Sequence, residues 1–174
     1  IDNNQDSINY GLKNNIIDNG YTVVKKEVIK NADLIIFTLY PNVFIEWIKE
    51  YGKFISSKTV VTDVTGVKGG VIEIIQSLLP DGVEFISAHP MAGKEVYGVE
   101  NSDKAIFKNA NYIVTPTDKN SPEATNACME LGRELGFSKI SELSPREHDE
   151  MIAFLSQLTH CIAVTLMTCN EKPM

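Results

Sequence analysis

The sequence predicts an α/β fold with a mostly parallel sheet, followed by the start of an all-helical element. Short apolar runs of strand length alternate with segments of helical periodicity over residues 1–143, a pattern typical of βαβ units. The chain of 174 residues is long enough to bury a sizeable core. From residue 144 onward only one long helical pattern follows. We therefore expect two regions, 1–143 and 144–174.

The first region is expected to contain four strands with helices between them. Apolar, β-branched runs predict the strands, and apolar residues recurring every three or four positions predict the helices. The expected strands span 33–39, 59–62, 83–86 and 111–115. The expected helices span 44–55, 67–78 and 121–135, and another begins near Gln5. Ser121 as N-cap, Pro122 at the first helical position and Gly136 after the end mark the third of these helices.

The second region begins with a capping-box sequence, Ser144-Pro145-Arg146-Glu147, and continues as a long helix. Its residues Asp149, Ser156 and His160 share one helical face, with Gln157 beside it. That face suits either a substrate pocket between two lobes or a solvated surface. The apolar stripe of the same helix lies elsewhere around it. His148 has no evident partner in the sequence, and we interpret it as structural.

Composition narrows the function classes. The formal charge of −7, without a basic stripe, argues against a nucleic-acid partner. No apolar run reaches the length of a membrane span, and no metal-ligand cluster is visible. The three cysteines have no CxxC spacing, so we expect buried thiols in a reducing compartment and hence a cytoplasmic protein. The chain begins at Ile1 rather than Met, which suggests that it lacks its beginning.

His89 is the strongest candidate for chemistry. In parallel sheets, ligands bind at the carboxyl ends of the strands, and His89 follows the strand expected at 83–86. Pro90 stiffens the backbone and Gly93 permits close approach of a ligand. A histidine held there is suited to proton transfer near neutral pH. The alternative is a surface-loop histidine without a role.

Two other segments could bind a ligand. The turn from Thr62 to Gly70, which contains Thr65 and Gly66, leads from a strand into a helix, where free N–H groups suit an anionic or strongly polar ligand. It could equally be an ordinary turn. Asp2 could accept both hydroxyls of an NAD ribose, or it could be an N-cap or part of a frayed terminus.

Together these segments resemble the prephenate/arogenate dehydrogenase family. The resemblance is carried by four motifs in register over nearly the whole chain. They are His89-Pro90-Met91-Ala92-Gly93 with Glu95 and Gly98, the turn from Asp63 to Gly69, Thr115-Pro116-Thr117, and Pro145-x-x-His148-Asp149 followed by Ser156-x-x-x-His160. The resemblance implies a Rossmann-like domain followed by a helical domain that forms a homodimer. It also implies oxidation of prephenate or arogenate with NAD(P)+ and loss of CO₂, giving 4-hydroxyphenylpyruvate or tyrosine.

The resemblance implies roles for individual residues. His89 matches the catalytic histidine, which takes the proton of the substrate's ring hydroxyl. His160, with Ser156 and Gln157, matches the substrate pocket, and Glu95 lies near its entrance. Asp2 matches the acid that binds the adenosine ribose and favours NAD over NADP. Leu39, Tyr40 and Pro41 match a loop beside the cofactor, and Thr65 with Gly66 lies between cofactor and substrate.

Three departures from the family pattern bear on the cofactor and substrate sites. The family's first strand and glycine-rich turn would precede Ile1. Gly66 stands where many members have Ser, and Thr65 is a possible substitute for that hydroxyl. Ser156-Gln157-Leu158-Thr159-His160 stands where the family often has Ser-His-Leu-Pro-His. Two other hypotheses therefore stay open: another two-domain dehydrogenase of the hydroxyacid type, which would need a catalytic Lys on the long helix, and a non-catalytic remnant that binds a regulator or partner.

Overall fold

The computed structural model describes residues 1–94 and 96–169. Its centre is a five-stranded sheet in the order β1-β2-β3-β4-β5. The strands are β1 (Leu34–Phe37), β2 (Val60–Asp63), β3 (Glu84–Met91), β4 (Asn111–Thr115) and β5 (Lys139–Glu142). All neighbouring pairs are parallel except β3 and β4, which are antiparallel. The mostly parallel α/β fold expected from the sequence is confirmed.

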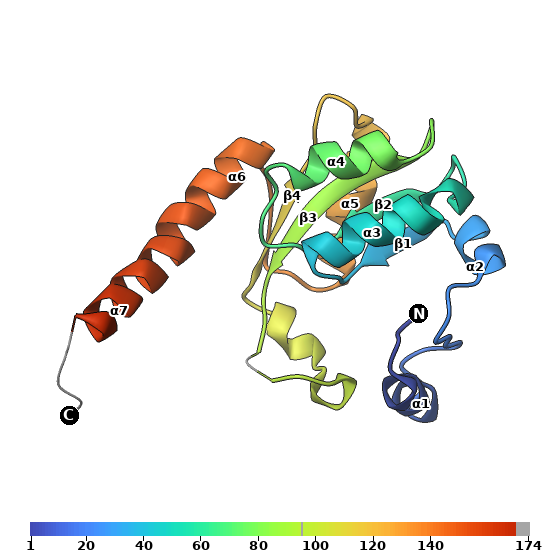
Figure 1. Ribbon diagram of the computed structural model, residues 1–174, viewed down its shortest axis with the longest axis horizontal. Helices are drawn as coiled ribbons and strands as arrows, with labels where there is room; N and C mark the ends of the chain where they lie inside the picture. The colour runs from blue at the N-terminus through green and yellow to red at the C-terminus, as the bar shows by residue number, and fades with distance from the viewer. Residues whose placement is uncertain (95, 170–174) are drawn as a thin grey trace.

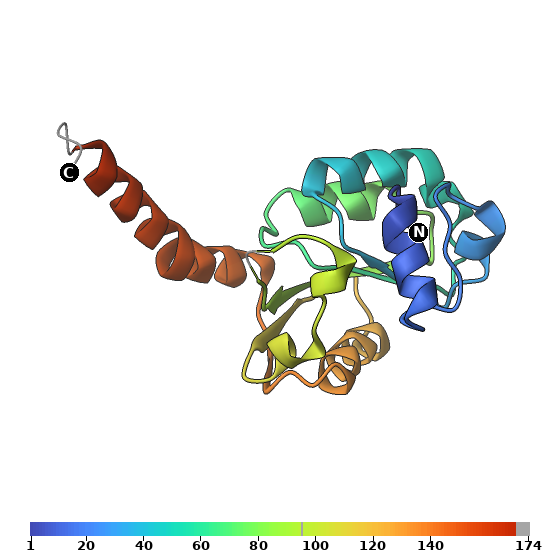
Figure 2. The same ribbon diagram turned by 90° about the horizontal axis from the view of Figure 1, so that it is seen from below.

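Helices cover both faces of this sheet (Figure 1). α3 (Pro41–Tyr51) and α4 (Val71–Leu78) lie on one face, and α5 (Pro122–Glu134) lies on the other (Figure 2). Phe44, Ile48 and Ile75 are almost fully buried against the first face, and Cys128 of α5 packs against the second. The described chain also contains α1 (Gln5–Lys13), α2 (Lys26–Lys30) and the short 3-10 turns η1 (Gly52–Phe54), η2 (Val99–Asn101) and η3 (Lys104–Phe107).

β1 forms one edge of the sheet built by the described residues. Its apolar side chains Leu34 and Ile36 are 42% and 43% exposed. Strands of parallel sheets are usually buried on both faces and flanked by neighbours, so an exposed apolar edge of this kind suits another strand.

Several boundaries differ from the sequence prediction. β3 extends to Met91, so His89 lies within a strand and faces Ile113 of β4. The pairing of β3 with β2 nevertheless ends at Ile86, so His89 lies beyond the carboxyl end of β2. α4 begins at Val71 rather than near residue 67, because the preceding turn folds inward before the helix starts. β5 and α2 were not predicted, since both are short and carry mixed polar and apolar residues.

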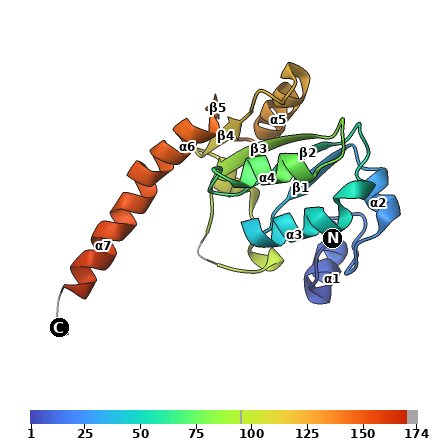
Figure 3. The ribbon, with the colours of Figure 1, turned by 45° about the horizontal axis from the view of Figure 1, so that its top comes forward.

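The capping box at Ser144 is confirmed, and it starts a continuous helical segment. This segment consists of α6 (Pro145–Ile152), the π-helical turn η4 (Ala153–Gln157) and α7 (Leu158–Thr168). It begins beside the sheet and projects away from it, as Figures 1 and 3 show. Of the expected apolar stripe only Ile152 is buried, and Leu155, Ile162 and Leu166 are exposed.

The helix Pro145–Thr168 corrects one expectation, because by length and composition it could cross a membrane. Core helices of soluble proteins can have the same length and composition. The first turns of the helix carry Arg146, Glu147 and Glu150, and the side chain of His148 is fully buried among protein groups. A second correction concerns the cysteines: Cys128 is buried as expected, but Cys161 and Cys169 are exposed.

Candidate active site

The candidate site begins with a buried polar cluster below His89. The Asp63 carboxylate, at the end of β2, is fully buried and accepts hydrogen bonds from Ser87 Oγ at 2.6 Å and from the Ala88 N–H at 3.0 Å. Lys68 Nζ lies 3.5 Å from the same carboxylate and donates to the carbonyl oxygens of Thr65 and Ala88, both at 2.7 Å. Burial lowers the pKa of Lys68, and Asp63 opposes that shift. This pairing ties the turn after β2 to β3, one residue before His89.

Thr65 belongs to this cluster. Its side chain is buried, and its hydroxyl donates to the Asp63 carboxylate and lies 3.4 Å from Lys68 Nζ. The hydroxyl is therefore already used inside the protein.

The backbone N–H groups at Lys68 and Gly69 bind the carboxylate of Asp149, a residue of α6. The Lys68 N–H lies 3.0 Å from Asp149 Oδ1, and the Gly69 N–H donates to Asp149 Oδ2 at 2.6 Å. The sequence predicted that free N–H groups here would suit an anionic ligand; these two N–H groups are instead occupied by a carboxylate from α6. The same contact fixes the start of α6 against the β2–α4 turn.

His148 corrects the sequence interpretation most strongly. Its side chain is fully buried, with Nε2 2.8 Å from His89 Nδ1 and Nδ1 2.8 Å from Asp149 Oδ1. The sequence had given it no partner. Nothing in the spacing of the Pro145-x-x-His148-Asp149 motif indicates that its histidine meets His89, 59 residues away.

His89 is half-buried and offers one ring nitrogen for chemistry. Nδ1 is paired with His148, and none of the hydrogen bonds within the described residues uses Nε2. A Cβ placed on Gly66 would lie 3.6 Å from that Nε2, so the absence of a side chain at position 66 leaves space in front of it. Burial lowers the pKa of His89 to about 4; Lys68 and His148 act in the same direction, whereas Asp63 and Asp149 oppose it. His89 is therefore neutral at pH 7.

The structure does not bring every predicted residue to His89. Ser156 lies half-buried in the π-helical turn, while Gln157 and His160 are exposed farther along the projecting helix. His160 is twelve residues beyond His148, which corresponds to roughly 18 Å along a helix axis.

Asp2 is exposed before α1, where its carboxylate accepts the Asn4 N–H at 2.8 Å, and Asn4 is the N-cap. Glu95 lies outside the described residues.

The loop Leu39-Tyr40-Pro41 lies where the sequence placed it, between β1 and α3. Tyr40 is the N-cap residue of α3 and is 77% exposed, and Pro41 is the first residue of the helix. Among the described residues, no side chain caps this helix N-terminus. Because α3 follows β1 directly, this N-terminus lies at the carboxyl edge of the sheet, where nucleotides bind in such folds.

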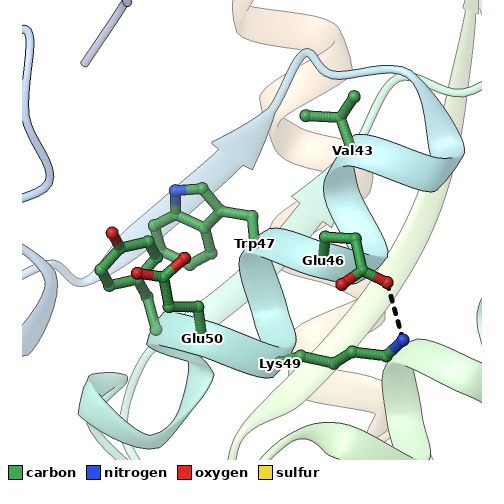
Figure 4. A pocket seen from close by; sticks show the side chains of 6 residues that line it. Val43, Glu46, Trp47, Lys49 and Glu50 are labelled. Carbon is green, nitrogen blue, oxygen red and sulfur yellow. Dashed lines mark hydrogen bonds and ion pairs between the residues drawn. The ribbon is translucent and has the colours of Figure 1, made fainter.

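Two surface hollows lie away from His89. One lies along α3, where the rings of Trp47 and Tyr51 are in contact, with centroids 5.2 Å apart. Glu46 and Lys49 form an ion pair in the same hollow (Figure 4). The other lies between Ile16 and the segment from Lys94 to Phe107, where Lys94 pairs with Asp103 at 3.0 Å. Since the charged pairs in both hollows are already satisfied within the protein, neither competes with the His89 region as a candidate active site.

A mostly parallel sheet with helices on both faces and polar groups at its carboxyl edge defines a Rossmann-like nucleotide-binding domain. Residues 1–140 match the family model described as "Prephenate dehydrogenase, nucleotide-binding domain". The chain therefore belongs to the prephenate dehydrogenase family, as the sequence resemblance indicated.

Individual relatives agree with this family. Prephenate dehydrogenase of Lactococcus lactis is 31% identical over 161 residues, covering 91% of this chain and 43% of that protein. The structure of prephenate dehydrogenase from A. aeolicus with hydroxyphenyl propionate and NAD+ has a TM-score of 0.84 at 26% identity, covering 97% of this chain and 58% of that one. Synechocystis arogenate dehydrogenase has a TM-score of 0.83 at 25% identity, covering 97% and 59%. The chain thus spans about half the length of these relatives.

Proposed function

We propose that the intact protein oxidises prephenate with NAD+, with loss of CO₂, to give 4-hydroxyphenylpyruvate, and that His89 is the base. The observation that carries the proposal is the free Nε2 of a neutral histidine beyond the carboxyl end of β2. A base must be unprotonated before it can accept a proton, and a geometry that holds base and substrate together supplies much of the rate. His89 Nε2 would accept the proton of the substrate's ring hydroxyl.

NAD would supply the chemistry of hydride acceptance, and this chain's residues fit part of its binding site. The uncapped N-terminus of α3, at Tyr40 and Pro41, offers the N–H groups of Asn42 and Val43 as donors, since proline itself has none. The exposed carboxylate of Asp2 suits ribose hydroxyls and disfavours the extra phosphate of NADP, so NAD is the proposed cofactor. Leu39 and Gly66 would lie beside the cofactor. Thr65 would contribute through its backbone, because its hydroxyl is bound to Asp63.

Substrate recognition is proposed to involve the space in front of Gly66 and the residues Glu95, Ser156, Gln157 and His160. We further propose residues 1–143 as the nucleotide-binding domain and residues 144–174 as the start of a helical domain that forms a homodimer. Seven large apolar side chains of the segment 154–167 are exposed, which supports a covering partner in the intact protein. We propose that the protein is cytoplasmic and binds neither nucleic acid nor a membrane.

The test is a spectrophotometric assay of the intact protein. Prephenate and arogenate are each combined with NAD+ or NADP+, and formation of reduced nicotinamide is followed. We expect the highest kcat/KM with prephenate and NAD+. A preference for arogenate would change the substrate assignment, and no turnover with any pair would favour a non-catalytic remnant of the fold.

Replacing His89 tests its role as the base. We expect His89→Asn to lower kcat by about 10²–10⁴-fold, the usual contribution of a general base, with a small change in KM. An undiminished rate of the chemical step, measured in a single turnover, would contradict the assignment of His89.

A further inference from the structure

His89 is the outer member of a row of three acid–base groups. His89 Nδ1 lies 2.8 Å from His148 Nε2, and His148 Nδ1 lies 2.8 Å from Asp149 Oδ1. Asp149 is itself held by the N–H groups of Lys68 and Gly69. The row therefore runs from a free imidazole nitrogen, through a fully buried histidine, to a carboxylate anchored on the β2–α4 turn.

The hydrogen-bond partners decide which atoms carry protons. Partial burial acts to raise the pKa of Asp149, but its bonds to the Gly69 N–H, His148 and the Lys68 N–H prevail and lower it, so Asp149 is ionised. An ionised carboxylate only accepts hydrogen bonds, and His148 must therefore carry its proton on Nδ1. Burial lowers the pKa of His148, although Asp149 opposes this. A neutral His148 then presents the lone pair of Nε2 to His89.

The same logic fixes the proton on His89. Because His148 Nε2 accepts, His89 must donate from Nδ1, and the lone pair of neutral His89 must lie on Nε2. That nitrogen faces the open space beside Gly66. The Nε2–H tautomer would place a proton where the proposed reaction needs a lone pair.

We propose that His148 and Asp149 are positioning residues that hold His89 in the Nδ1–H tautomer, and that the Asp149 carboxylate favours its protonated form. The role of this row in catalysis rests on the proposed function, whereas the tautomer it imposes does not. When Nε2 accepts the substrate's hydroxyl proton, His89 becomes an imidazolium. Its Nδ1 proton stays shared with His148 Nε2, which brings the positive charge toward the Asp149 carboxylate. The bond that forms is His89 Nε2–H, the bond that breaks is the O–H of the substrate, and nothing in the row is oxidised or reduced.

The tautomer can be measured without any substrate. In ¹⁵N NMR spectra of the intact protein labelled on histidine, a protonated ring nitrogen and one with a lone pair resonate far apart. The His89 signals are assigned by their loss in His89→Asn. We expect a protonated Nδ1 and an unprotonated Nε2 in the wild type. In His148→Phe, which removes the acceptor but keeps the bulk, we expect His89 to shift toward the Nε2–H tautomer. A wild-type Nε2–H tautomer, or no change in His148→Phe, would overturn the proposal.

Two neighbouring carboxylates of α6 provide a matched pair of variants for kinetics. Asp149→Asn removes the negative charge in either orientation of the amide, and we expect kcat to fall on the order of 10²-fold or more. Glu150→Gln makes the same chemical change at an exposed carboxylate paired only with Arg146, and we expect kcat to stay within about twofold. Equal kcat values for the two variants would count against the row.

Failure of this proposal and failure of the proposed function give different results. If the wild type oxidises neither prephenate nor arogenate, the proposed function fails, and the NMR measurement still decides whether the row sets the tautomer of His89. If the wild type is active but His89 keeps its tautomer in His148→Phe, only this proposal fails. Circular dichroism and thermal unfolding check that each variant is folded; should His148→Phe not fold, the wild-type tautomer and the comparison of kcat between Asp149→Asn and Glu150→Gln remain decisive.

Discussion

The polar cluster around Asp63 and the projecting helix α7 reverse the usual relation between polarity and burial. Asp63 and Lys68 are charged side chains, yet both are fully buried, and every buried side-chain nitrogen and oxygen in the described part of the chain has a hydrogen-bond partner. Ile162 and Leu166 of α7 are apolar, yet they are 51% and 68% exposed. Burial therefore depends on the contacts that surround a side chain. The polar groups of the cluster form hydrogen bonds and ion pairs with one another, so they can be buried. Within residues 1–169, α7 has no apolar surface packed against Ile162 and Leu166, so they stay exposed.

The largest expected effect comes from breaking the cluster. Lys68→Met leaves the Asp63 carboxylate buried without its counter-charge, and we expect the free energy of unfolding to fall by about 3–5 kcal/mol. Urea denaturation followed by circular dichroism measures this change. The matched control is Lys94→Met, which removes one partner of the exposed Lys94–Asp103 pair and should cost at most about 1 kcal/mol. Similar losses for both variants would mean that the buried pair is no different from a surface pair.

The two ends of the projecting segment can be compared with the same residue type. Ile152 is 7% exposed and Ile162 is 51% exposed. In a polypeptide of residues 1–174, Ile152→Ala should lower the free energy of unfolding by about 2–5 kcal/mol, and Ile162→Ala should change it by less than about 0.5 kcal/mol.

The intact protein sharpens this pair of measurements. If a covering partner or further domain packs on α7, Ile162→Ala should become as costly there as Ile152→Ala, because the side chain would then be buried. An Ile162→Ala cost that stays near zero in the intact protein would contradict the proposed coverage of α7.

The pH dependence of catalysis tests whether the partial burial of His89 lowers its pKa. Burial lowers the pKa of His89 from 6.5 to about 4, so the base stays neutral until the pH falls near 4. We expect kcat/KM, which reports the free enzyme, to change little between about pH 7.5 and 5.5 and to fall only below that range. A loss of half the activity near pH 6.5 would show that His89 titrates as an exposed histidine.

The smallest effect is expected at Gly66. A Cβ there meets His89 Nε2 and Cε1 at 3.6 and 3.7 Å, which is ordinary contact. Gly66→Ser should therefore change the free energy of unfolding by less than about 0.5 kcal/mol. Its hydroxyl would lie within reach of His89, so we expect a modest increase in kcat relative to Gly66→Ala, which adds the same carbon without the hydroxyl. A lower kcat for the serine variant would show that the open space at position 66 is needed.

The sequence by itself determined the elements whose signals are local. Strand runs such as 59–62, the apolar stripe of α3, and the caps at Ser121 and Ser144 were all predictable, because the residues that form them lie within a few positions of each other. His89 could be singled out because its place after a buried run indicates the carboxyl edge of a sheet. The family was visible in the spacing of its motifs, and the comparisons confirm it.

Only the tertiary structure decided what surrounds His89. The contact of His148 with His89, the capture of Asp149 by the β2–α4 turn and the burial of Lys68 join residues that are 59, 80 and 20 positions apart. The sequence reveals which residues share a face of a helix, because that depends only on their spacing. Which other element that face packs against depends on how the connecting segments place the helix relative to the sheet. For that reason a buried histidine with two hydrogen-bond partners could not be told from an unpartnered one until the fold placed α6 against β3.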